Sequence, residues 1–148
     1  MTATNLSPLL KEPRRESTVS DLEKLADKII DSQTGISGFA LKAALKAATK
    51  VRPNVLAQAI DRLLPDVLGE LEGYWQEFSN SNSDDFGVFL SPRSQQVIDS
   101  LLAVADQHAD RVNNATLTKA YQSLRGKAAG LLEPYVTDMG QILQRNLG

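Results

Sequence analysis

Apolar residues recur at every third or fourth position along most of this chain, which is the spacing that places them on one face of an α-helix. The spacing predicts helices over residues 20–32, 36–51, 53–78, 91–112 and 115–132, with a last helix that opens at Pro134. No stretch alternates apolar and polar residues for long enough to predict a β-strand. We therefore expect an all-α protein, an antiparallel bundle of about six helices.

Signals for helix ends fall between these segments. Ser20 and Glu23 are spaced as a capping box, in which each side chain bonds the backbone amide of the other, so the first helix is expected to begin there. Pro65 lies inside the third segment and is expected to kink it or to break it briefly, because a proline removes one helical hydrogen bond. Residues 79–87 are rich in Ser, Asn and Asp and predict the main loop.

Composition indicates the domain organisation. The 148 residues, 42% of them hydrophobic, suit one domain, and because only 5% are aromatic, Ala and Leu must fill most of its core. Pro8 and Pro13 predict an N-terminal tail over residues 1–17, followed by a single helical-bundle domain over residues 18–148. The chain has no cysteine, which excludes disulfides, thiol catalysis and thiolate metal sites.

An internal repeat is expected within this domain. Residues 36–78 align with residues 97–139 without a gap, and eleven of the 43 pairs are identical. The pattern Gly-x-Leu-Glu-x-Tyr occurs at residues 69–74 and again at residues 130–135. Two Ala- and Leu-rich helices also match by chance, but chance explains this pattern less well. A duplicated helical hairpin would give the bundle a pseudo-two-fold axis.

The repeated glycines and tyrosines have a structural interpretation. Gly69 and Gly130 fall inside predicted helices, where glycine costs about 1 kcal/mol relative to alanine. A close crossing of two helices is the expected compensation. Tyr74 and Tyr135 are expected to bury their rings and to turn their hydroxyls toward the end of the bundle.

Residue patterns that carry catalysis are missing. His108 is the sole histidine, and no nucleophile elbow or phosphate-binding loop accompanies it. Asp106 and Asp110 flank it at i, i+4 spacing, which suits a solvated helix face better than a bound cation. We therefore predict a protein that is not an enzyme, with no catalytic residue, cofactor or metal.

A row of lysines is the sharpest surface feature. Lys42, Lys46 and Lys50, the lysine row, are spaced i, i+4, i+8 on one predicted helix, and Arg52 extends them. The apolar stripe expected on the opposite face of that helix consists of Leu41, Ala44, Leu45, Ala48 and Val51. Like charges at this spacing repel by a few tenths of a kcal/mol. Water, salt, a partner or the acidic neighbours Asp21, Asp27 and Asp31 must offset that repulsion.

These four basic residues are the candidate surface for an anionic partner. A weaker cluster consists of Lys119, Arg125 and Lys127 around Tyr121. The net charge is −2, and residues 1–78 and 79–148 each carry −1. Because nucleic-acid binding needs clustered Lys and Arg, no nucleic-acid partner is expected.

The function indicated is an interaction or scaffold role through helix surfaces, with an unknown protein partner or by self-association. The alternative is a binder of an anionic partner or lipid, through the lysine row or a cavity in the bundle. The N-terminus lacks the apolar core of a signal peptide, and no apolar run approaches the ~20 residues that span a bilayer. The expected location is the cytoplasm, and the protein is not expected to be transmembrane.

Four segments carry a family resemblance: residues 35–42 (GISGFALK), 50–53 (KVRP), 63–66 (LLPD) and 119–127 (KAYQSLRGK). In them the chain resembles an uncharacterised family of small Ala-rich helical proteins of mycobacteria and corynebacteria. The resemblance implies an actinobacterial, cytosolic helical protein whose N-terminal segment is partly ordered. It implies no activity and supplies no catalytic residue.

Overall fold

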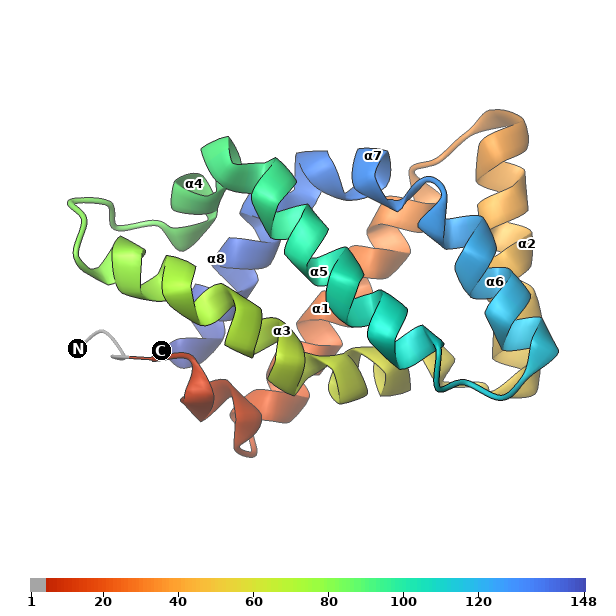
Figure 1. Ribbon diagram of the computed structural model, residues 1–148, viewed down its shortest axis with the longest axis horizontal. Helices are drawn as coiled ribbons and strands as arrows, with labels where there is room; N and C mark the ends of the chain where they lie inside the picture. The colour runs from red at the N-terminus through yellow and green to blue at the C-terminus, as the bar shows by residue number, and fades with distance from the viewer. Residues whose placement is uncertain (1–4) are drawn as a thin grey trace.

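The computed structural model describes residues 5–148, apart from the side chain of Ser37, and every regular element in this part of the chain is a helix (Figure 1). The α-helices are α1 (Arg14–Asp31), α2 (Gly35–Val51), α3 (Val55–Ser79), α4 (Phe86–Leu90), α5 (Ser94–Ala109), α6 (Ala115–Arg125), α7 (Ala128–Leu132) and α8 (Val136–Leu147). Short 3₁₀ helices are η1 (Ser7–Leu10), η2 (Ser91–Arg93) and η3 (Glu133–Tyr135). The all-α class predicted from the sequence is confirmed.

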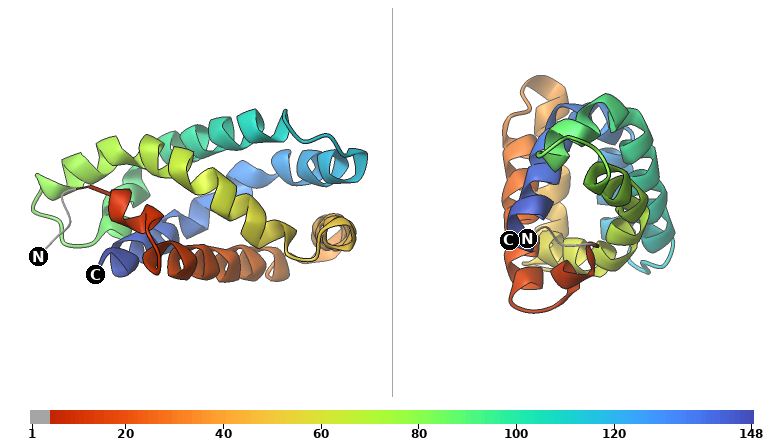
Figure 2. Two further views of the ribbon diagram at one scale, coloured as in Figure 1. Left: turned by 90° about the horizontal axis from the view of Figure 1, so that it is seen from below. Right: turned by 90° about the vertical axis from the view of Figure 1, so that its left-hand side faces the viewer.

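Most of the helices surround one hydrophobic core. Its buried side chains come from the N-terminal segment through η1 and from α1, α3, α4, α5 and α8. Helices α2 and α6 pack chiefly against each other and lie side by side at one end of the elongated molecule (Figures 1 and 2). The C-terminus lies at the opposite end. The molecule therefore has a main body and a distinct end built from two helices.

Helix α1 begins at Arg14 instead of the predicted Ser20, which lies inside it. Thr18 and Val19 are buried, and Thr18 Oγ1 donates a hydrogen bond to the Arg14 carbonyl at 2.7 Å. A capping interaction contributes about 1 kcal/mol, whereas most helical stability in proteins comes from tertiary packing. Packing of the first turns therefore sets the start of α1, and the capping box does not.

The N-terminal segment packs on the helices. Leu6 and Leu9 are fully buried in the main core, and the Leu6 backbone N–H donates to Glu72 Oε1 at 3.1 Å. This part of the expected tail over residues 1–17 thus contacts the folded domain, while residues 1–4 lie outside the described residues.

Helix α4, which the sequence pattern did not predict, lies where the main loop was expected to end. The Asp85 side chain caps it by accepting a hydrogen bond from the Val88 backbone N–H at 3.0 Å. Phe86 is completely buried, and its ring meets Trp75 edge to face with the centroids 4.9 Å apart. The loop predicted over residues 79–87 is therefore too long, because burial of Phe86 draws its last residues into the core.

Glycines allow α4 and α8 to cross closely. A Cβ on Gly140 would lie 2.6 Å from Gly87 Cα, and a Cβ on Gly87 would lie 2.1 Å from the Thr137 carbonyl oxygen. The close crossing predicted at Gly69 and Gly130 is wrong, because both are exposed and a Cβ there would meet nothing within 4 Å. The close helix crossing expected to compensate for helical glycines thus occurs at Gly87 and Gly140.

Helix α3 runs through Pro65 as one helix of 25 residues. The predicted repeat aligns residues 55–78 of this helix with residues 116–139, which are divided among α6, α7, η3 and the start of α8, with an interruption at Gly126 and Lys127. The two aligned segments differ in element structure. The internal repeat and the antiparallel order of the bundle stay predictions.

Candidate interaction surface

Small side chains hold α2 against α6. Ala48 of α2 and Leu117 and Ala120 of α6 are buried together, and Ala44 and Val55 pack against them. This cluster is separate from the main core. The two helices and their flanking turns, residues 32–54 and 111–127, therefore form a layer of their own, which we call the α2–α6 end.

A hydrogen-bonded charge pair joins this end to the main body. Asp106 of α5 accepts hydrogen bonds from Tyr121 Oη at 2.5 Å and from Arg125 Nε and Nη2 at 2.9 and 3.2 Å. The Arg125 hydrogen bond, and next that of Tyr121, holds the pKa of Asp106 below its ordinary 3.8. Burial, and next the hydrogen bond to Asp106, raises the pKa of the Tyr121 hydroxyl. Of the weaker predicted cluster, Arg125 is thus paired, while Lys119 and Lys127 are exposed.

The lysine row is exposed along its length. Lys42, Lys46 and Lys50 are open to solvent, as is Arg52, which follows α2. Within residues 5–148, no ion pair at 4.0 Å or less reaches any of these four. Their mutual repulsion is therefore not relieved by a carboxylate contact in the described part of the molecule.

The acidic residues suggested as neighbours of the row are not its partners. Asp21 accepts hydrogen bonds from Asn146 Nδ2 at 3.0 Å and from Arg145 Nη2 at 3.1 Å, which joins α1 to α8. The Asn146 hydrogen bond is the main cause that lowers the pKa of Asp21. Asp27 and Asp31 are exposed on α1.

Two large apolar side chains share the exposed face with the lysine row. Ile36 is 91% exposed and Phe39 is 76% exposed. At about 100° per residue, Lys46 and Lys50 point about 20° to either side of Phe39 around the helix axis. Ile36 points about 60° from Phe39, on the side of Lys50. The solvent face of α2 therefore carries aromatic, aliphatic and cationic groups together.

The buried face of α2 follows the predicted stripe in part. Leu41 and Ala48 are buried, whereas Val51, at the helix end, is 39% exposed. The exposed Ile36 and Phe39 were not recognised from the sequence, although helical spacing of about 100° per residue places both outside the apolar stripe and beside the lysine row.

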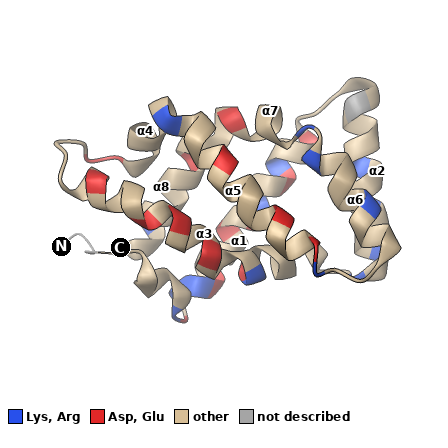
Figure 3. Cartoon of the chain, in the orientation of Figure 1, with Lys and Arg blue, Asp and Glu red and all other residues tan. Residues whose placement is uncertain are grey.

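Charge is divided unequally between this end and the rest of the molecule. Residues 32–54 and 111–127 contain eight of the sixteen Lys and Arg residues and none of the eighteen Asp and Glu residues. In Figure 3 the ribbons of α2 and α6 carry blue segments and no red ones. The rest of the chain therefore has eight basic residues against eighteen acidic ones. Each half of the sequence contributes one acid-free segment, so the two halves have equal charge. A comparison of the halves therefore does not show the charge difference between the α2–α6 end and the rest of the chain.

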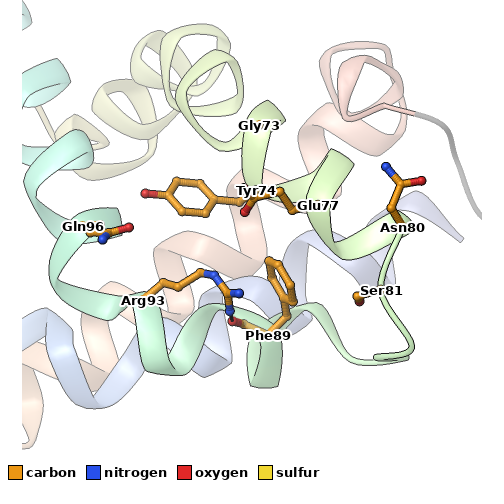
Figure 4. A pocket seen from close by; sticks show the side chains of 8 residues that line it. All are labelled: Gly73, Tyr74, Glu77, Asn80, Ser81, Phe89, Arg93 and Gln96. Atoms are coloured by element: carbon orange, nitrogen blue, oxygen red, sulfur yellow. Dashed lines mark hydrogen bonds between the residues drawn. The ribbon is translucent and has the colours of Figure 1, made fainter.

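An open groove of about 610 Å³ lies on the other part of the molecule, between α3 and the α4–α5 region (Figure 4). The Arg93 guanidinium lies 4.0 Å from the Phe89 ring centroid and donates to the Phe89 carbonyl at 2.7 Å. Tyr74 lines the groove with its hydroxyl on the side of Gln96. The cation in this groove is thus engaged by Phe89 of the preceding helix α4, and the groove offers a weaker site than the α2–α6 end.

The residues considered for a cation site serve a structural role. His108 Nε2 lies 2.7 Å from Asp66 Oδ2 and links α5 to α3. Asp106 binds Arg125, and Asp110 is exposed. Among the described residues, no group of three or more His, Asp or Glu side chains is placed to hold a metal ion.

A family model matches this chain over residues 6–147, and its description is "family of unknown function (DUF6918)". Because the match covers almost the whole sequence, the chain belongs to this family. No curated protein and no solved structure matches it significantly. In residues 5–148, no helix has the length and apolar character to cross a bilayer.

Proposed function

We propose that this member of the DUF6918 family is a non-enzymatic interaction protein that binds an acidic partner surface through its α2–α6 end. The observation that carries the proposal is the unpaired lysine row beside exposed Ile36 and Phe39, in an end without acidic residues. Like charges repel one another, and large apolar side chains gain free energy when they leave water. An acidic partner with some apolar surface would neutralise the repulsion among the lysines and would take Ile36 and Phe39 out of water.

A second copy of the chain fits this surface poorly. In a two-fold dimer the same patch meets itself, so one lysine row would face the other. No acidic residue lies in the α2–α6 end to neutralise them. The charge of the end therefore favours a different molecule over self-association.

The two carboxyl groups with perturbed pKa values offer no general acid at neutral pH. A general acid at neutral pH needs a raised carboxyl pKa. The pKa values of Asp106 and Asp21 are lowered instead, by hydrogen bonds that join helices. We extend the proposal to a cytoplasmic, actinobacterial protein, following the sequence resemblance, and to a partner that is not nucleic acid.

Site-specific crosslinking tests the proposal, and the absence of cysteine simplifies it. A benzophenone is attached to Ala43→Cys, an exposed position on α2, or to Ala103→Cys, an exposed position on α5. In native lysate that retains its membranes, we expect adducts at position 43 and none at position 103, detected by gel shift and intact mass. Lys42→Glu/Lys46→Glu should abolish them.

The control for that charge change is Lys24→Glu/Lys28→Glu, which alters two exposed lysines of the same spacing on α1. It should leave the adducts at position 43 intact. Equal labelling at both positions, no adduct at position 43, or equal loss with the control variant would each show that the α2–α6 end is not the contact surface.

A further inference from the structure

We infer that the acidic partner is the surface of an anionic lipid bilayer, on which the α2–α6 end lies with Ile36 and Phe39 inserted among the headgroups. The inference rests on the proposed function and specifies its partner. It is carried by the joint exposure of two large apolar side chains and three unpaired lysines on one helix face.

The arrangement of this face matches the layers of a membrane interface. Peripheral helices place aromatic and aliphatic side chains at the acyl boundary and Lys or Arg at the level of the headgroups. Ile36 and Phe39 occupy the first turns of α2, and the lysine row continues along the next turns for about 12 Å at 1.5 Å per residue. Lysine is long enough to extend its charge toward phosphates while its stem lies along apolar groups.

The cations of this end are spread out and do not converge. Arg52 beyond α2 and Lys119 and Lys127 around α6 are also exposed. The groove between α3 and the α4–α5 region and the smaller hollow between α1 and α3 are lined by other residues. Exposed, scattered cations suit a fluid layer of anionic headgroups, in which each basic residue adds about fivefold to binding. A folded acidic protein would need complementary shape as well.

The charge of the rest of the molecule orients it on such a surface. Outside the α2–α6 end, eighteen acidic residues outnumber eight basic ones. An anionic bilayer repels that body and attracts the end, so the field favours one approach direction. Nucleic acid would supply the phosphates, but the phosphate backbone offers no apolar phase for Ile36 and Phe39.

Vesicle sedimentation of the full chain tests the inference. The probes are phosphatidylcholine vesicles with about a third phosphatidylglycerol and vesicles of phosphatidylcholine alone. We expect binding to the anionic vesicles only, at about 50 mM NaCl, and its loss at about 500 mM NaCl, where the Debye length is shorter. Lys42→Gln/Lys46→Gln should weaken binding about 25-fold, because each lysine contributes about fivefold.

Two further variants separate insertion from simple charge attraction. Ile36→Ser/Phe39→Ser should weaken binding about tenfold, through loss of apolar burial, and should keep the salt dependence. Lys24→Gln/Lys28→Gln, the matched control on α1, should bind within about twofold of the wild type. All of these residues are exposed, so each variant is expected to fold, which circular dichroism checks.

The outcomes separate this inference from the proposed function. Crosslinks at position 43 without vesicle binding would overturn the membrane assignment and leave an acidic protein as the partner. Binding that is unchanged by Ile36→Ser/Phe39→Ser, or that is stronger for a short DNA duplex than for vesicles, would also overturn it. Absence of crosslinks at position 43 would overturn the proposed function itself, and the membrane assignment with it.

Discussion

At the scale of single residues, two helical glycines of this chain differ in role because their surroundings differ. Gly69 and Gly140 both lie inside helices, where glycine lowers helix stability relative to alanine. Gly140 is buried against Gly87 at the crossing of α4 and α8, while Gly69 faces open space. The sequence alone marked Gly69 and Gly130 because they recur, and recurrence carries no information about what lies opposite.

Substitution of these glycines by alanine should therefore have opposite effects. Gly140→Ala places a Cβ 2.6 Å from backbone and should destabilise the protein by about 1–3 kcal/mol, as overpacking does. Gly69→Ala, the matched control, should stabilise it by up to about 1 kcal/mol through helix propensity. Urea unfolding monitored by circular dichroism measures both, and a Gly140→Ala variant as stable as the wild type would show that the crossing is not tight.

At the scale of elements, local signals predicted some helices closely and others not at all. The helix expected over residues 36–51 matches α2 to within one residue, because a glycine precedes it and a proline follows soon after it. Helix α4 was not predicted, because its five residues are too few to show a periodic pattern. Burial of Phe86 fixes this helix in place. The interruption at Gly126 and Lys127 also has no strong local signal.

The contact between α5 and α6 predicts a pH-dependent stability. Because the folded-state pKa of Asp106 is lowered, its ionised form stabilises the fold above the ordinary value of 3.8, and this contribution is lost as pH falls through the lower folded value. Asp106→Asn should lower Tm at neutral pH, and the difference from the wild type should shrink in acid. Asp99→Asn, exposed on the same helix, should have no such effect.

Thermal unfolding followed by circular dichroism at several pH values measures this difference. A Tm difference between Asp106→Asn and the wild type that stays constant from neutral pH into acid would contradict the assigned role of the carboxylate. Equal Tm values at neutral pH would show that the hydrogen bonds from Tyr121 and Arg125 add nothing to stability.

At the scale of the whole molecule, folding separates a basic α2–α6 end from an acidic remainder, and this separation is not visible in the linear sequence. The two acid-free segments lie far apart in sequence, one in each half, and the pairing of α2 with α6 brings them together. The lysine row and the placement of Ile36 and Phe39 beside it follow from helical spacing. The separation of a basic end from an acidic remainder depends on tertiary structure. This pairing is a non-local contact, which helical periodicity does not predict.

A fluorophore sensitive to polarity, attached to Ala43→Cys or to Ala103→Cys, tests most directly whether α2 is the contact surface. On addition of the vesicles that contain phosphatidylglycerol, a blue shift is expected at position 43 alone, and high salt should reverse it. The acidic body should keep position 103 in water. Equal shifts at the two positions, or a shift at position 103 alone, would contradict binding through the α2–α6 end.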